Sequence, residues 1–329
     1  MKYFLLITVS LLSSVYIFNY TIDPFGIQNK LCEQKYKPVL NERAKKYRNI
    51  FYENNIKYYD SLILGSSRVM KIVPSNSKIT SSFYNFGVHV ANNAEKLYIL
   101  KEWLKVKQLK TVYLGIDYFN FHSLQRPLYV NYQKFKEGVD INYFSFSTFK
   151  LSIKSLINKI NDKPITYFND DGSINYVNKD KLIMQKKYNF TTQHFIEMAK
   201  NGIEKDLVNK KFTIENRVYD ILTEFKKLSY EYNFKLIVFI TPMNHSVLDQ
   251  LETNHQDILN KFKIIDKKLV GIFGEIYKFN TRNTLNENNE NFYDPHHYRS
   301  IIGDNIVNRI NNINDHYGII LNKDFSNAL

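Results

Sequence analysis

The chain has a single cysteine, Cys32, among its 329 residues. One cysteine excludes an internal disulfide framework and any metal site built from several thiolates. Cys32 also lies too far beyond the apolar start of the chain to be the modified cysteine of a lipoprotein. Structures and sites that depend on several thiols are therefore excluded.

Acidic residues are scarce relative to basic ones, with 32 Asp and Glu against 45 Lys and Arg, which gives a formal net charge of +13. A positive field of this size suits an anionic lipid surface, an acidic glycan or nucleic acid. The basic residues are scattered, and no zinc-finger, RNA-binding-sheet or helix-turn-helix signature accompanies them. We therefore expect no nucleic-acid partner. A compositional bias of the genome would produce the same charge.

The chain has one long apolar run, residues 3–20, preceded by Lys2. A membrane-spanning helix needs about 20 such residues, whereas the apolar region of a cleaved signal peptide has about 7–15. No small-residue cleavage pattern follows, because residues 16–20 are bulky and aromatic. These features favour an uncleaved signal anchor over residues 1–22, with a secretory signal peptide as the alternative. We expect a single-pass protein of the cytoplasmic membrane whose body is extracytoplasmic, on the periplasmic side or at the cell surface.

Residues 23–57 form the expected lead-in between the anchor and the body. Pro24 and Gly26 end the first helix, because proline removes a donor and glycine permits a turn. The four basic side chains within residues 41–52 predict a basic surface helix. We interpret it as a solvated face near lipid headgroups, with a substrate clamp as the alternative.

Short apolar runs alternate with helical patterns over residues 58–315. Strands are expected at 62–64, 82–86, 111–116, 234–240 and 276–280, and helices at 94–106, 214–230, 244–259 and 301–310. This alternation predicts an α/β domain with a parallel sheet covered on both faces. Residues 122–211 lack a clear period and indicate an insertion whose Tyr and Phe residues suit either sugar stacking or a small core of its own. Residues 316–329 are predicted to be a polar C-terminal tail.

Gly-Ser-Ser-Arg at 65–68 directly follows the expected strand at 62–64. In an open α/β sheet, ligands and reacting groups gather outside the carboxyl ends of the strands. Ser66 and Ser67 are therefore candidate nucleophiles.

Asp294 and His297 lie far downstream, three residues apart. A serine becomes an effective nucleophile when a histidine takes its proton and a carboxylate orients that histidine. One short loop can place this aspartate against this histidine. His296 competes because it is adjacent, but the three-residue interval favours His297.

Together, Gly-Ser-Ser-Arg and the closing Asp-x-x-His-Tyr-Arg-x-x-x-Gly at 294–303 resemble the motifs of the SGNH hydrolase superfamily, also called GDSL-like esterases. Residues 84–87, Tyr-Asn-Phe-Gly, stand where the second family block has its glycine. Residues 113–117, Tyr-Leu-Gly-Ile-Asp, stand where the third block has Gly-x-Asn. The order of motifs is similar to that of a membrane-anchored bacterial branch with an N-terminal span and an Asp-Pro-Phe lead-in.

The resemblance implies a three-layer α/β/α, flavodoxin-like fold behind one N-terminal transmembrane helix. It places Ser67 at the nucleophile position, with Ser66 replacing the family aspartate and attack by Ser66 as the alternative. It makes His297 the base and Asp294 the residue that orients it. The resemblance assigns the oxyanion donors to the amide of Ser67, the amide of Gly87 and the side chain at position 117.

Asp117 departs from this pattern, since an asparagine is expected there and a carboxylate repels an oxyanion unless it is protonated or turned away. Asn85, Asn92 or Asn93 are candidates to replace it. Arg68 and Asn85 are the expected substrate contacts, Arg68 through its positive charge. A pair with a surface acid is the alternative role for Arg68.

These features predict a membrane-anchored acyl esterase or O-acyltransferase that acts on a cell-envelope glycan or lipid. Related folds serve in alginate O-acetylation and D-alanyl transfer to teichoic acids, which suggests a multi-span membrane acyltransferase as a partner. No metal or organic cofactor is expected, because a Ser-His-Asp triad needs neither. The alternative is a non-catalytic envelope polysaccharide binding or assembly protein with a degenerate SGNH fold.

Overall fold

The computed structural model describes residues 1–26, 33–37, 42–52, 55–73, 82–122, 143–313 and 316–326. Cys32 and residues 123–142 of the expected insertion lie outside this part. The chain forms two compact units, of which the first comprises Met1–Ile56, Val130–Asp170 and Ile174–Tyr188. The second comprises Lys57–Tyr129, Asp171–Ser173 and Asn189–Leu329. The residues expected to form an insertion at 122–211 are thus divided between the two units.

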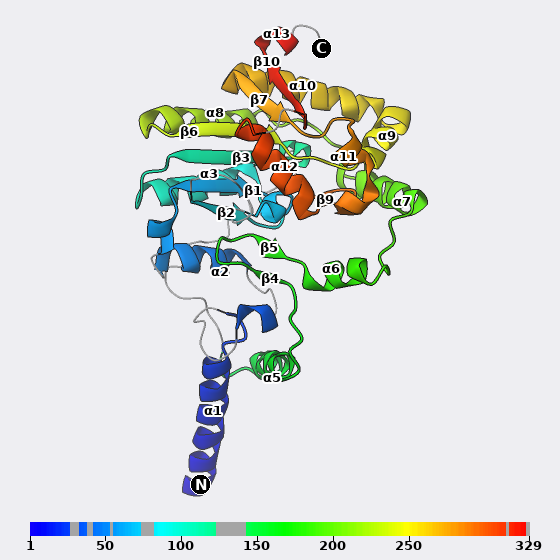
Figure 1. The fold of residues 1–329 in the computed structure, drawn as a ribbon. Coiled ribbons are helices and arrows are strands. Elements are labelled where there is room, and N and C mark those ends of the chain that lie inside the picture. The colour runs from blue at the N-terminus through cyan, green and yellow to red at the C-terminus, as the bar shows by residue number, and fades with distance from the viewer. Residues whose placement is uncertain are drawn as a thin grey trace. The chain divides into compact units, whose positions relative to one another are not determined.

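The second unit is built on a six-stranded sheet with the order β10-β7-β6-β3-β1-β2 (Figure 1). Five strands run parallel: β1 (Ser61–Gly65), β2 (Phe83–Gly87), β3 (Thr111–Ile116), β6 (Lys235–Ile240) and β7 (Glu275–Lys278). The expected α/β class with a mostly parallel sheet is confirmed.

The C-terminal segment adds an antiparallel edge strand, β10 (Ile319–Asn322), to this sheet. Its polar composition predicted only a tail. Tyr317 and Leu321 are each only 1% exposed, so two apolar side chains anchor the segment at the sheet edge.

Helices cover both faces of the sheet because its central strands are apolar on both faces. Helix α12 (Ser300–Ile310) shares one core cluster with the side chains of Ile63, Tyr113 and Ile237. Helices α3 (Asn93–Leu104), α8 (Arg217–Glu231) and α10 (Gln256–Phe273) contact one another in series, and α8 and α10 also contact β6 and β7. The unit is completed by α7 (Thr192–Ile203), α9 (His245–Asn254), α11 (Thr284–Glu287), α13 (Lys323–Ser326) and the hairpin of β8 (Phe292–Asp294) and β9 (His297–Tyr298).

The first unit contains α1 (Lys2–Ile22), which is long and apolar enough to cross a membrane and whose side chains are mostly exposed. It also contains α2 (Glu42–Tyr47), α5 (Phe146–Ile160), α6 (Val177–Met184) and the hairpin of β4 (Tyr167–Phe168) and β5 (Ile174–Asn175).

The prediction of a solvated basic helix at 41–52 is wrong for the residues that the structure describes there. Lys46, Tyr47 and Ile50 are at most 1% exposed. The charge pattern suggested a surface helix, but the apolar side chains between the charges pack inside the first unit. Close by in the sequence, the side chains of Lys37 and Asp23 form a fully buried ion pair, with Nζ and Oδ2 3.4 Å apart.

Candidate functional site

The candidate site lies at the carboxyl ends of three neighbouring strands. Ser66, Ser67 and Arg68 follow β1, Asp117 follows β3, and Thr241 follows β6. Since β2 and β3 lie on opposite sides of β1, these residues surround the point where the strand order reverses. Crevices at such a point are the usual ligand sites of open α/β sheets.

The side chain of Val69, in the turn after β1, packs closely against three glycines. A Cβ built on Gly65, Gly87 or Gly115 would lie 2.4, 2.6 or 2.5 Å from a Val69 methyl carbon. These glycines close β1, β2 and β3 or lie one residue before the strand end, and Val69 is fully buried. The three glycines therefore leave the space that the Val69 side chain fills. The buried Val69 in turn positions the preceding serines over the sheet.

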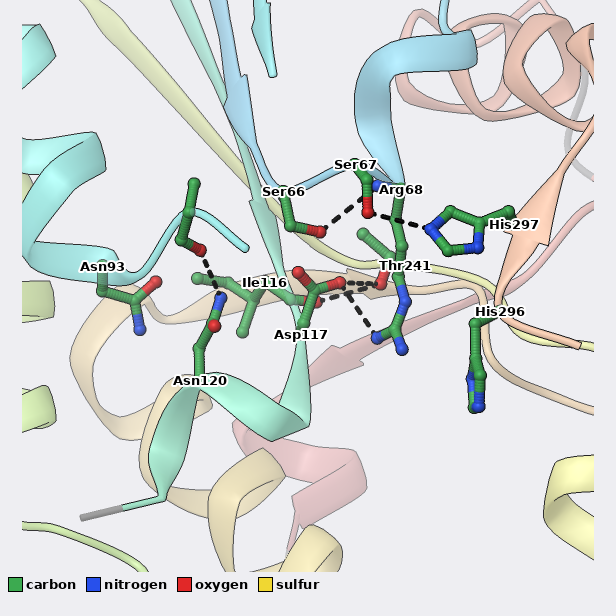
Figure 2. A network of polar contacts seen from close by, with 12 residues as sticks. Ser66, Ser67, Arg68, Asn93, Ile116, Asp117, Asn120, Thr241, His296 and His297 are labelled. Atoms are coloured by element: carbon green, nitrogen blue, oxygen red, sulfur yellow. Dashed lines mark hydrogen bonds and ion pairs between the residues drawn. The ribbon is translucent and has the colours of Figure 1, made fainter. Parts of the chain in front are cut away.

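A chain of hydrogen bonds links Ser67, His297 and Asp294. Ser67 Oγ lies 2.9 Å from His297 Nε2 (Figure 2), and His297 Nδ1 lies 2.8 and 2.9 Å from the two carboxylate oxygens of Asp294. Because Nδ1 faces a carboxylate, which only accepts when ionised, Nδ1 carries the proton and Nε2 accepts the Ser67 hydroxyl. The structure brings together the three residues expected to form the triad.

The β8–β9 hairpin holds this geometry. Asp294 ends β8 and His297 begins β9, and Asp294 Oδ1 also accepts the backbone N–H groups of His296 and His297, each at 3.0 Å. Burial raises the pKa of Asp294, but the hydrogen bond and charge of His297 outweigh it and hold the pKa well below its usual range. The carboxylate is therefore ionised at neutral pH.

Neither of the two competing residues joins this chain. The Ser66 hydroxyl accepts the backbone N–H of Arg68 at 3.2 Å. The His296 ring packs edge-on against Phe119, with ring centroids 5.5 Å apart, and both its nitrogens are buried without a partner in the described part of the chain. Burial, with the Arg68 charge nearby, lowers the pKa of His296 to about 3. His296 is thus a neutral wall residue.

Arg68 and Asp117 form a buried ion pair beside Ser67, with Nη1 and Oδ1 3.2 Å apart (Figure 2). Thr241 donates to the same oxygen at 2.5 Å, and the guanidinium carbon lies 4.4 Å from the centre of the Phe119 ring. Burial raises the pKa of Asp117, but the charges of Arg68 and Lys96 and two hydroxyl hydrogen bonds bring it below its ordinary value. Asp117 is therefore a fixed anion whose partner is a buried arginine, not a surface residue.

Lys96 lies behind this ion pair and is 2% exposed. Its ammonium donates to the Gly115 carbonyl at 2.9 Å and to Asn93 Oδ1 at 3.1 Å. Burial lowers its pKa to about 8, although the Asp117 charge works in the opposite direction. The buried Asp117 carboxylate thus interacts electrostatically with two cations, Arg68 and Lys96.

Gly87 and Asn85, two residues at the end of β2 with expected roles at the site, make hydrogen bonds within the protein. Gly87 N–H, an expected oxyanion donor, donates instead to Asn85 Oδ1 at 2.9 Å. Asn85, an expected substrate contact, is fully buried and gives its amide hydrogens to the carbonyls of Val69 and Ile72 at 2.7 and 2.8 Å. Asn85 therefore ties β2 to the turn after Ser67 and has no donor left for a substrate.

The other expected donors are not available beside Ser67 either. Asp117 accepts hydrogen bonds and cannot donate one while ionised. Asn92 Oδ1 caps α3 by accepting Glu95 N–H at 2.9 Å, and Asn93 Oδ1 accepts from the Lys96 ammonium, while Asn93 Nδ2 is buried without a partner in the described residues. Neither asparagine lines the pocket next to Ser67.

A pocket of about 220 Å³ opens beside Ser67. Its walls include residues that the sequence did not single out, because they follow no motif and come from separate segments: Val90, Phe119, Asn120, His122, Asp206 and Lys210. Asp206 and Lys210, from the region expected to be an insertion, pair at 2.9 Å. His122 accepts Thr213 N–H at 3.3 Å through Nδ1, and its buried Nε2 has no partner in the described residues.

Within the described part of the chain, no group of three or more His, Cys, Asp or Glu side chains is placed to hold a metal ion. A serine hydroxyl bonded to an imidazole, which is itself oriented by a carboxylate, is an arrangement suited to nucleophilic attack on a carbonyl. No protein-family model and no curated protein sequence matches this chain.

Proposed function

We propose that the protein is a membrane-anchored serine esterase or O-acyltransferase of SGNH type that acts on an acylated glycan or lipid of the cell envelope. The observation that carries the proposal is the hydrogen-bonded chain from Ser67 through His297 to Asp294. The order β2-β1-β3-β6-β7 supports the assignment, because it corresponds to the 2-1-3-4-5 order of flavodoxin-like sheets. The apolar helix α1 supports the anchor.

In the proposed reaction, Ser67 Oγ attacks the carbonyl carbon of an ester while His297 Nε2 takes the hydroxyl proton. The tetrahedral intermediate collapses, and His297 returns that proton to the leaving alcohol. The acyl group then stays on Ser67 as an ester. Water, or a sugar hydroxyl in the case of transfer, attacks this ester with His297 again as base and regenerates Ser67. Asp294 offsets the positive charge that His297 carries between these steps.

The developing oxyanion needs donors, and two groups beside Ser67 suit this task. The Ser67 backbone N–H donates to no group in the described part of the chain. Arg68 lines the same pocket, and among the described residues only Nη1 of its guanidinium donates a hydrogen bond, to Asp117. We therefore assign the oxyanion to the Ser67 amide and Arg68, with Asp117 as the residue that positions Arg68.

The size of the pocket points to a small acyl group. At about 220 Å³ it is below the roughly 300–1,000 Å³ of sites that enclose drug-sized ligands. A short acyl chain fits such a space, while the rest of a glycan or lipid lies outside. For transfer, a multi-span membrane acyltransferase is the class of partner that delivers acyl groups at a membrane.

A second candidate function is non-catalytic binding of an envelope polysaccharide. Two observations favour it: the carboxylate at position 117 and the engagement of Gly87 N–H by Asn85. Under this candidate, Ser67→Ala leaves the biological role intact, whereas changes to the pocket walls do not.

Labelling of the full chain in detergent with a fluorophosphonate, read by intact mass, tests the proposal. We expect one adduct on the native protein, loss of the adduct in Ser67→Ala and His297→Ala, and retention in Ser66→Ala. Ser66→Ala is the matched control, because it removes a neighbouring hydroxyl that does not contact His297. An unlabelled native protein with an intact unfolding transition contradicts the enzyme proposal and favours the binding candidate.

A further inference from the structure

Helix α5 reverses the usual burial pattern of a protein helix. Its small polar residues Thr148, Ser152 and Ser155 are at most 3% exposed. Four of its large apolar residues face outward: Phe146 is 68% exposed, Ile153 37%, Ile157 51% and Ile160 73%. In water such a helix would expose the side chains that gain most from burial.

The exposed apolar residues form one stripe. Phe146, Ile153, Ile157 and Ile160 recur at intervals of seven, four and three residues, which places them on one face of a helix. Lys150 and Lys154, both exposed, border the stripe on one side. An apolar face bordered by lysines is typical of a helix that lies in the surface of a membrane.

The buried polar face of α5 is fixed to α1. Ser152 Oγ donates to Asn19 Oδ1 at 2.8 Å, and Asn19 Nδ2 donates to the Tyr143 carbonyl at 2.6 Å. Phe149 packs on Phe18 with ring centroids 5.3 Å apart. Small residues and hydrogen-bonded polar side chains are what hold helices together beside lipid. Helix α5 therefore lies against the C-terminal part of α1 (Figure 1).

Aromatic rings gather at the same junction. Tyr16 and Tyr20 of α1 stack at 5.8 Å, and Tyr143 meets both rings at 5.7 Å. Phe144 adds a fourth ring, 4.9 Å from Tyr16 and itself 54% exposed. Tyrosine and other aromatic side chains concentrate at the membrane–water interface. The cluster therefore lies where α5 begins beside α1, and its composition is typical of the membrane–water interface.

We propose that α5 is an interfacial helix whose exposed face, Phe146, Ile153, Ile157 and Ile160, is embedded in the lipid bilayer that α1 spans. The inference rests on α1 being the proposed membrane anchor. The bilayer is the occupant because the stripe is continuous with α1, whose apolar side chains are themselves exposed, as with Leu5 at 66% and Leu11 at 62%. Lys150 and Lys154 are placed to reach anionic headgroups.

Spin labelling of the full chain tests this inference. In a Cys32→Ser background, single cysteines at Leu11, Ile157, Ile160, Lys154 and Ile264 carry a nitroxide, and the protein is reconstituted in vesicles of phosphatidylethanolamine and phosphatidylglycerol. Power-saturation EPR compares the accessibility of each label to oxygen, which concentrates in lipid, and to a nickel chelate, which stays in water. Ile264 of α10 is the matched control for Ile157, because it is 53% exposed in the other unit.

We expect the oxygen-to-nickel accessibility ratio at Ile157 and Ile160 to exceed that at Lys154 and Ile264 several-fold. Ratios at Ile157 and Ile160 equal to that at Ile264, with Leu11 in lipid, overturn the interfacial helix and leave the anchor intact. A label at Leu11 in water overturns the anchor and this inference with it. Low accessibility to both reagents at Ile157 and Ile160 means that protein covers the stripe, which also overturns it. A thermal unfolding transition unchanged from the Cys32→Ser protein shows that each variant is folded.

Discussion

The Arg68 guanidinium and the Asp117 carboxylate meet across 3.2 Å inside the pocket that also presents Ser67. Asp117 accepts from Thr241 as well, and Arg68 stacks on Phe119. These contacts hold the Arg68 guanidinium in one place. It therefore loses little conformational entropy when it binds a transition state. This pair determines how we expect the site to respond to substitution.

Asp117→Asn removes the charge that holds Arg68 and offsets Lys96 while keeping the side-chain shape. We expect the free energy of unfolding in urea to fall by about 3 kcal/mol, because breaking one side of a buried ion pair costs roughly 3–5 kcal/mol. We also expect slower fluorophosphonate labelling of Ser67. Faster labelling would contradict the assignment of Arg68, since it would mean that an amide at position 117 serves as the better donor.

Arg68→Gln removes the proposed oxyanion donor. Loss of one such donor costs about 10²–10³ in rate in acyl-transfer enzymes, so we expect a decrease of roughly that size in the rate of labelling and of p-nitrophenyl acetate hydrolysis. Arg68→Lys keeps the charge but loses the planar fork and should recover part of the rate. Arg282→Gln is the control, because Arg282 forms its ion pairs on the exposed surface. Equal rates for native protein and Arg68→Gln would remove Arg68 from the mechanism.

We expect His296 to make the protein less stable in mild acid. Its pKa of about 3 in the folded state lies below the ordinary value of 6.5, so as pH falls below about 6.5 the unfolded chain binds a proton that the folded chain does not. Each pH unit in that window then costs up to about 1.4 kcal/mol. From about pH 7 to about pH 5, we expect the free energy of unfolding to decrease in the native protein by about 1–2 kcal/mol more than it does in His296→Phe.

Urea unfolding at the two pH values measures this difference. Asp117 and Asp294 do not interfere, because their folded pKa values are lowered and their contributions are lost only below the unfolded pKa of about 4. Identical pH dependence in the native protein and His296→Phe would show that the His296 ring is accessible to protons in the folded state.

Gly115→Ala forces a methyl group against Val69, 2.5 Å from one of its methyl carbons. Overpacking of this kind costs about 1–3 kcal/mol, and we expect Ser67 labelling to slow because Val69 positions the turn that carries it. Val69→Ala opens the space but leaves a cavity under the turn. The double variant should therefore be more stable than the sum of the single effects predicts. Strict additivity in urea unfolding would indicate that the strands move apart instead.

Asn85→Ala removes the side chain that binds Gly87 N–H and the carbonyls of Val69 and Ile72. Three backbone groups each lose a hydrogen bond in a buried setting, so we expect a loss of about 2 kcal/mol in the free energy of unfolding. Asn254→Ala is the control, since the Asn254 amide donates to Gln250 on the exposed surface and its removal should cost little. An effect no larger than that of Asn254→Ala would mean that water replaces the lost bonds.

Local sequence patterns determine much of this protein. Apolar runs such as 62–64, 111–116 and 234–240 identify strands of a parallel sheet, because both faces of such strands are buried and few other segments tolerate that composition. Asp294 and His297 meet because they lie three residues apart in one hairpin, which is a local constraint. The apolar stretch of α1 is equally legible, because length and composition alone decide whether a helix can cross a bilayer.

Only the tertiary structure decides how the remaining residues are used. The Asn85 amide donates to backbone groups of another segment, and the charge of Asp117 is balanced by an arginine that lies 49 residues away in the chain. Helix α5 exposes its apolar stripe because the opposite face, through Ser152, is bonded to Asn19 of α1. Hydrogen bonds and ion pairs between distant segments depend on how the elements pack. They cannot be predicted from the periodicity or spacing of residues within one segment. The sequence therefore identifies the three residues of the hydrogen-bonded chain, while packing determines which donors, which charges and which apolar faces remain available around them.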